Sequence, residues 1–124
     1  MSTQTDTTAL FKHADGGVAY AAGQAVFSEG EPGTTMYAVQ SGSVTLLVNG
    51  VVVETVGPGG LLGELALIDN EPRTATAIAE VDSTLVPVDQ ARFMLMIRQT
   101  PFFAMDVMRL LARRLRQTDR LIHP

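Results

Sequence analysis

Short runs of β-forming residues, separated at intervals of about eight to twelve residues by Gly, Pro, Asn or Asp, constrain the fold of this chain most strongly. The pair Asn49 and Gly50 is the clearest separator, because both residues tolerate positive φ and stand between two valine-rich runs. Such spacing is typical of an antiparallel sandwich or barrel and not of alternating β–α units. A short helix is predicted over residues 9–14, and strands over residues 18–21, 25–28, 35–40, 43–48, 51–56, 73–81 and 84–88.

The pattern changes to a helical period after residue 88. Asp89 is a suitable N-cap for a helix over residues 90–99. Thr100 followed by Pro101 then predicts the start of a second helix, which continues to Ile122. We therefore expect a pair of helices at the C-terminal end of the β-rich region.

Apolar and small residues recur along the last predicted helix at alternating steps of four and three: Ala104, Met108, Leu111, Leu115, Thr118 and Ile122. This stripe is too short to argue for a coiled coil. Two interpretations remain open, since the stripe suits either packing against the strands or pairing with the same helix of a second copy. Val107 and Leu110 widen it enough for one face to meet the strands and another a partner.

Length and composition narrow the classes of protein. A chain of 124 residues with 46% hydrophobic content predicts one domain over residues 1–124, with a barrel at about 16–88 and helices at about 89–122. There is no cysteine, and His13 and His123 stand near the ends, so we predict no metal site and no catalytic residues. No signal peptide and no apolar run of the ~18 residues that span a membrane are found, so we expect a cytoplasmic protein.

The segment over residues 57–79 combines the features of a small-ligand site. Glu64 opens a short apolar run that suits one or two helical turns, whose first N–H groups favour an anion. Pro72 stiffens the exit of a turn, so that Arg73 leaves it at a fixed angle with a guanidinium that forks onto two oxygens, as a phosphate requires. Four glycines let the backbone approach a ligand closely: Gly57, Gly59, Gly60 and Gly63.

Glu64 is unusual beside a phosphate site, because its carboxylate would repel the ligand unless it faced a donor such as a ribose hydroxyl. Thr74 adds a hydroxyl, and Ala75 and Ala77 leave room and exposed backbone N–H groups. These features together predict a pocket for a small, phosphorylated, ribose-bearing ligand.

A simpler interpretation of each charged residue stays open. Glu64 suits the first turn of a helix, where the helix dipole favours an acid. Arg73 suits an ordinary surface position paired with Glu71 or Asp69.

The run Gly63 to Leu67 (GELAL), followed after five residues by residues 73–77 (RTATA), closely resembles the phosphate-binding cassette of the cyclic nucleotide-binding domain family. The resemblance covers about residues 18–120, and Leu62 departs from the aromatic residue that the family commonly has before this glycine. Its upstream positions are Gly33, Tyr37, Val39, Gly42 and Val44.

The resemblance implies a mainly β fold, a β-roll or jelly-roll barrel (double-stranded β-helix) with flanking helices and a C-terminal helical pair. It implies that Glu64 accepts the ribose 2′-OH, that Arg73 pairs with the cyclic phosphate, and that backbone N–H groups complete the phosphate cradle. Arg113 or Arg114 would cover the base as a lid, the alternative being a solvated helix charge. The implied ligand-binding set is Gly63, Glu64, Leu65, Ala66, Arg73, Thr74 and Ala75.

The function so implied is a non-enzymatic, stand-alone regulatory module of bacterial type that binds cAMP in preference to cGMP and signals by repositioning its C-terminal helix. No other cofactor is expected. A homodimer through that helix and a protein effector are further expected partners, whereas no DNA or membrane binding is expected, because no helix-turn-helix follows. The alternatives are a protein-interaction or regulatory subunit of the same fold without a nucleotide, and a small-barrel metalloenzyme, which the lack of clustered histidines disfavours.

Overall fold

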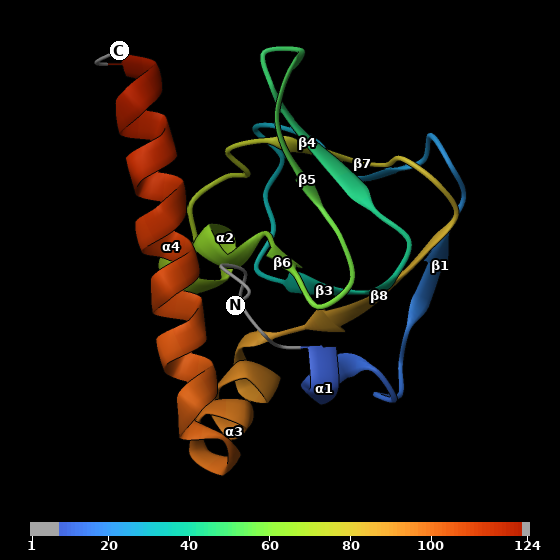
Figure 1. Ribbon diagram of the computed structural model, residues 1–124, viewed down its shortest axis with the longest axis vertical. Helices are drawn as coiled ribbons and strands as arrows, with labels where there is room; N and C mark the ends of the chain where they lie inside the picture. The colour runs from blue at the N-terminus through green and yellow to red at the C-terminus, as the bar shows by residue number, and fades with distance from the viewer. Residues whose placement is uncertain (1–7, 123–124) are drawn as a thin grey trace.

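The computed structural model describes residues 8–122 (Figure 1). Two four-stranded sheets form its β-rich part, and every strand pair is antiparallel. One sheet has the order β1 (Val18–Tyr20), β8 (Ser83–Val88), β3 (Met36–Ser41), β6 (Leu61–Leu62). The other has the order β2 (Ala25–Phe27), β7 (Thr76–Ala79), β4 (Val44–Val48), β5 (Val51–Val56).

The predicted mainly β fold with C-terminal helices is confirmed, and the two sheets are not closed into a barrel. The hairpin at Asn49 and Gly50 is confirmed as well, with φ of 52° and 78° at the two positions. Glu29 supports this turn from another strand connection, since its carboxylate accepts a hydrogen bond from the Asn49 N–H at 3.0 Å.

Within residues 8–122, four helices flank the sheets: α1 (Thr8–Phe11), α2 (Glu64–Asp69), α3 (Gln90–Gln99) and α4 (Pro101–Ile122). Asp89 caps α3 as predicted, because its side chain accepts a hydrogen bond from the Arg92 N–H at 2.8 Å. The long α4 runs along one side of the sheets and passes close to α2, while α3 packs beside its first turns (Figure 1). None of these helices within residues 8–122 combines the length and hydrophobicity needed to cross a membrane.

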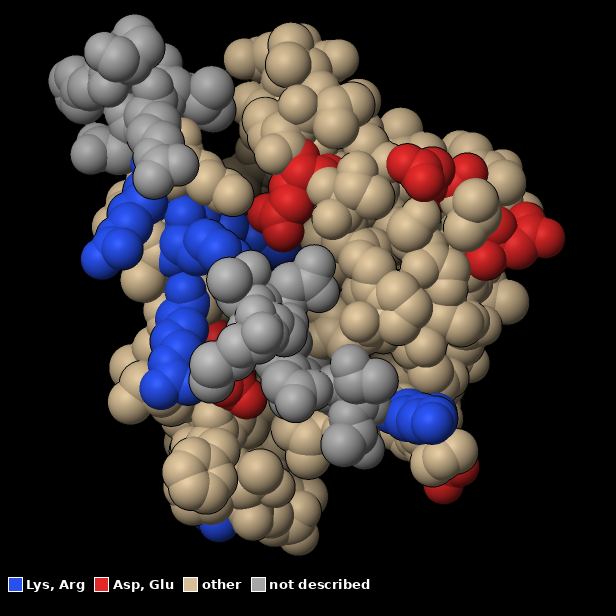
Figure 2. Space-filling model, in the orientation of Figure 1, with Lys and Arg blue, Asp and Glu red and all other residues tan. Residues whose placement is uncertain are grey.

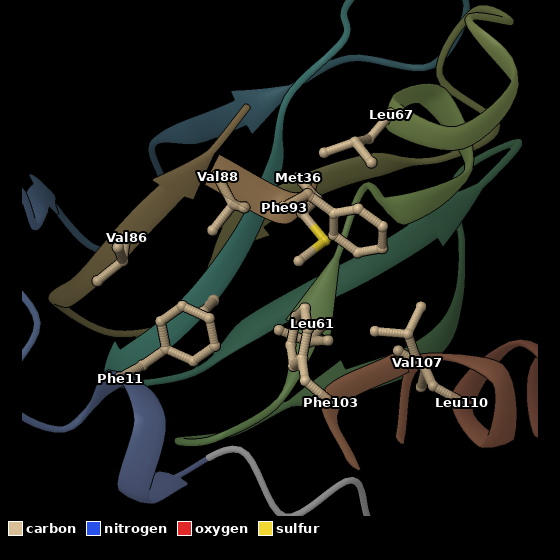
Figure 3. Packing of buried hydrophobic residues seen from close by; sticks show 11 residues of the cluster. Phe11, Met36, Leu61, Leu67, Val86, Val88, Phe93, Phe103, Val107 and Leu110 are labelled. Atoms are coloured by element: carbon tan, nitrogen blue, oxygen red, sulfur yellow. The ribbon is translucent and has the colours of Figure 1, made fainter. Parts of the chain in front are cut away.

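The core between α4 and the β3 sheet is aromatic. Phe103 is fully buried and packs edge-to-face on Phe11 and Phe93, with ring centroids 6.2 and 5.7 Å apart. Figure 3 shows Met36 of β3 and Leu61 of β6 pointing into the same cluster. This packing fixes which face of α4 meets the sheets.

The stripe predicted along α4 is therefore divided between two environments. Phe103, Val107 and Leu110 are the buried residues, whereas Met108 and Leu115 are 54% and 70% exposed. The side chains of Thr118 and Ile122 lie outside the residues whose side chains the structure describes. The residues of α4 that contact the sheets thus each stand one position before a residue of the predicted stripe, because Phe103 and not Ala104 packs in the aromatic cluster.

Candidate functional site

The site is built around the start of α2. Gly63 precedes this helix with a positive φ of 78°, a conformation that side chains rarely adopt. The turn places Glu64 at the first helical position, where it is 4% exposed. Ala66, two residues further, is buried, while Leu65 points outward and is 41% exposed.

The side chain of Arg73 also reaches Gly63, the residue that precedes α2. The backbone N–H of Arg73 donates to Glu31 O at 2.9 Å, and its carbonyl accepts from Gly30 N–H at 2.8 Å. The side chain turns inward, leaving the residue 6% exposed, and Nη1 donates to the carbonyl of Gly63 at 3.3 Å. The alternative of an exposed arginine paired with Glu71 or Asp69 is therefore wrong.

An aromatic ring supports the Arg73 guanidinium. The Cζ atom of Arg73 lies 4.3 Å from the centroid of the Phe27 ring and 6.0 Å from the centroid of the Tyr37 ring. Two glycines make room for it, since a Cβ at Gly33 or Gly63 would lie 2.6 or 2.7 Å from a guanidinium nitrogen. Burial lowers the pKa of Arg73, against smaller opposing contributions from Tyr37 and Glu31. The fold therefore holds the positively charged guanidinium of Arg73 in buried surroundings that disfavour its charge.

The two oxygens of Glu64 have different surroundings. Oε1 accepts a hydrogen bond from Nη1 of Arg114 at 2.7 Å. Oε2 is buried and has no hydrogen-bond partner within the part of the chain that the structure describes, and the same holds for Nε of Arg73. An unpaired buried polar atom costs free energy, so two of them on side chains of opposite charge call for a physical reason.

Arg114 connects α4 to Glu64 at the start of α2. Its guanidinium donates to both oxygens of Glu54 on β5, at 2.9 and 3.1 Å, and to the carbonyl of Leu61 at 2.7 Å, in addition to Glu64. Burial lowers the pKa of Arg114, but the hydrogen bonds and charges of Glu54 and Glu64 outweigh it and raise the pKa. One cation thus joins β5, the start of α2 and α4. Figure 2 shows the column of basic side chains along α4, with acidic side chains beside it.

A cavity of about 230 Å³ lies between β5, β6 and α4, and Glu54, Leu61, Leu110, Arg113, Arg114 and Gln117 are among its lining residues. We call it the α4 cavity. Neither Glu64 nor Arg73 lines it, and Arg114, which does, connects the cavity to Glu64. Of the two predicted lid residues, Arg113 lines this cavity and Arg114 is held by the two glutamates.

The remaining predicted residues lie around these charges in different degrees of exposure. Thr74 is exposed and Ala75 is half-buried, both immediately after Arg73 and ahead of β7. The sequence interpretation missed Phe27 and Glu54. Glu54 carries a signal that was available, since it is a single charge within the apolar run VVVETV. Within residues 8–122, no three His, Asp or Glu side chains gather to hold a metal ion.

Known proteins match this arrangement. A family model described as "Cyclic nucleotide-binding domain" matches residues 18–100. The chain is 35% identical over 105 residues to a Cyclic AMP receptor protein of Thermus thermophilus, a match that covers 81% of this chain and 49% of the relative. It thus spans about half the length of that relative, or less for others.

Solved structures agree. The crystal structure of Thermus thermophilus Catabolite Activator Protein has a TM-score of 0.76 and 34% identity, covering 86% of this chain and 53% of that one. A structure described as "A cyclic-GMP-dependent signalling pathway regulates bacterial phytopathogenesis" has a TM-score of 0.73 and 31% identity, covering 87% of this chain and 91% of that one.

Proposed function

Because the chain belongs to the cyclic nucleotide-binding domain family, we propose that it is a non-catalytic regulatory module that binds a cyclic nucleotide, with cAMP preferred over cGMP. The observation that carries the proposal is the pair of unpartnered buried atoms, Nε of Arg73 and Oε2 of Glu64. One is a charged donor and the other a charged acceptor. A cyclic nucleotide offers the complementary groups, an anionic phosphate and a ribose hydroxyl, on one rigid unit.

The charges around the site support this assignment of groups. Arg73 carries a positive charge that burial disfavours, so a phosphate beside it would restore the favourable surroundings of that charge. Glu64 keeps one oxygen on Arg114 and has the other unpartnered, which suits a neutral hydroxyl donor. Backbone N–H groups at Ala66, Thr74 and Ala75, with Gly63 and Leu65 beside them, would complete the cradle.

Titration calorimetry tests the proposal. Protein freed of carried-over nucleotide by unfolding and refolding is expected to bind cAMP saturably, with one site per chain, and cGMP more weakly. Relatives whose descriptions name one nucleotide or the other support a shared site for both. A chain that refolds but takes up neither nucleotide would instead support the protein-interaction alternative.

The C-terminal helix is the proposed output. The α4 cavity, at about 230 Å³, is smaller than the ~300 Å³ at which ligand pockets typically begin. If the ribose of the nucleotide lies on Glu64, its base would therefore enter this cavity only when Arg114, and α4 with it, shifts. Arg114 on α4 is hydrogen-bonded to Glu64 and Glu54, so a ligand that binds Glu64 changes the contacts that hold α4 in place. Ligand binding would then favour the conformation in which α4 has moved.

Spin labels measure this movement directly, because the chain has no cysteine of its own. Labels on Val51→Cys and Arg116→Cys, both exposed positions, report the distance between the β4–β5 hairpin and α4. Saturating nucleotide is expected to move the peak of the distance distribution. An unchanged distribution in a sample shown to be saturated would rule out repositioning of α4.

The exposed face of α4 is the proposed surface for a homodimer. Phe102, Met105, Met108 and Leu115 are 82%, 45%, 54% and 70% exposed. Light scattering at tens of micromolar is expected to give twice the chain mass of 13.3 kDa. The double variant Met108→Glu and Leu115→Glu is expected to give the mass of one chain, because opposed carboxylates would replace the apolar contact. A wild-type mass of one chain would contradict the dimer.

A further inference from the structure

We propose that Phe27 is a positioning residue for the phosphate-binding arginine: its ring face holds the Arg73 guanidinium in place while leaving the N–H groups of that guanidinium available. The inference rests on the proposed function, since it concerns the same site. Phe27 is the last residue of β2 and is 5% exposed.

The geometry is that of a cation over an aromatic ring. The distance of 4.3 Å between Arg73 Cζ and the Phe27 centroid lies within the ~6 Å at which such pairs attract each other. Tyr37 lies beside this contact, because its ring is 6.1 Å from the Phe27 ring at an interplanar angle of 31° and 6.0 Å from Arg73 Cζ. The second ring limits where the first can move.

Arg73 has little other support for its charge. Among the described side chains, no carboxylate forms a salt bridge with Arg73, Glu31 contributes only a smaller charge interaction, and the Arg73 side chain makes one long hydrogen bond, to the carbonyl of Gly63 at 3.3 Å. Arg114 shows the other solution within the same site, since two carboxylates occupy its donors. A carboxylate on Arg73 would take the N–H groups that a phosphate needs and would also repel the phosphate.

A ring face avoids both effects. The attraction between a cation and a ring is directed to the face of the ring, along the ring normal, whereas guanidinium hydrogen bonds lie within the guanidinium plane, so a ring face need not occupy an N–H donor. Phe27 therefore stabilises the charge without occupying its donors, which agrees with the unpartnered Nε. The sequence motif around residue 73 carries no information about this partner, which lies on a strand more than forty residues earlier.

A purely structural role of Phe27 makes a different prediction. Phe27 also belongs to the apolar cluster with Val39 and Leu62, so any smaller residue would loosen the packing. A test must therefore change the electron density of the ring while leaving its size nearly constant. Successive fluorination of the ring does this, because each fluorine withdraws density from the ring face.

The experiment incorporates mono-, di- and trifluorophenylalanine at position 27 and measures cAMP and cGMP affinity. The dissociation constant is expected to rise with each fluorine, by about threefold to thirtyfold over the series, the range for a lost cation–ring contact. The same series at Phe93, buried in the separate cluster under α4, is the matched control and should leave the affinity unchanged.

A second measurement needs no nucleotide. The Arg73 Nε–H proton is expected to show a ring-current shift that disappears in Phe27→Leu, while the other arginine signals stay in place. A flat affinity series at position 27, in a protein whose wild type binds nucleotide, would overturn the inference alone. A wild type that binds neither nucleotide would overturn the proposed function and this role together.

Discussion

Replacing Arg73 by alanine is expected to weaken cyclic-nucleotide binding by about 1.5–3 kcal/mol or more, which is a factor of roughly ten to over a hundred in the dissociation constant. The reason is that the guanidinium is buried and makes one hydrogen bond, to Gly63, while its Nε has no partner among the described residues and can donate to the proposed phosphate. Calorimetry on the refolded variant measures the change.

The fold should tolerate this substitution better than the binding does. Burial disfavours the charge of Arg73, so removing it also removes a cost, and thermal unfolding is expected to move little. Arg98→Ala, at an exposed position in the last turn of α3, is the matched control and should bind like the wild type. Wild-type affinity in the Arg73 variant would refute the assignment of the phosphate site.

Replacing Arg114 by methionine is expected to lower the free energy of unfolding by about 3 kcal/mol, because it leaves Glu54 and Glu64 without their cation. Glu64 is the more sensitive of the two, since its side chain is 5% exposed and already has one unpartnered oxygen. Urea unfolding followed by circular dichroism measures the loss.

The comparison that isolates the ion cluster is a triple variant. Adding Glu54→Gln and Glu64→Gln to Arg114→Met removes the two uncompensated charges and is expected to recover most of the stability. Arg116→Met, at an exposed position on α4, controls for the loss of a helix arginine and should change stability by less than about 0.5 kcal/mol. Equal stability of the Arg114 and Arg116 variants would show that the cluster contributes nothing.

Local chemistry accounts for the parts of the fold that the sequence predicted. The Asn49–Gly50 hairpin, the Asp89 cap and the short helix beginning at Glu64 each depend on residues adjacent in the chain. Strand β6 was missed because Leu61–Leu62 is two residues long and is defined by pairing with Tyr37 and Ala38, far away in the sequence.

The same distinction separates the parts of the site. Glu64 and Arg73 were predicted because their spacing forms a motif, and the structure buries both residues, with the Arg73 side chain bonded to the carbonyl of Gly63. The partners of Arg114 were not predicted, because Glu54 lies 60 positions away; its place as a single charge within an apolar run marks Glu54 itself but not the residue that pairs with it. The buried face of α4 was displaced by one residue for a similar reason, since the aromatic cluster that selects it comes from three helices.

The backbone pairing of Arg73 with Gly30 and Glu31 makes the connection between β2 and β3 a spacer for the guanidinium. Both main-chain groups of the arginine are fixed to that connection, so its length determines how far the side chain projects past Gly33. Lengthening the connection by a single residue would move the guanidinium away from Gly63 and Phe27 although every side chain of the motif stayed the same. Among related chains, the loop length between these two strands therefore carries information on the position of this arginine that motif matching alone does not contain.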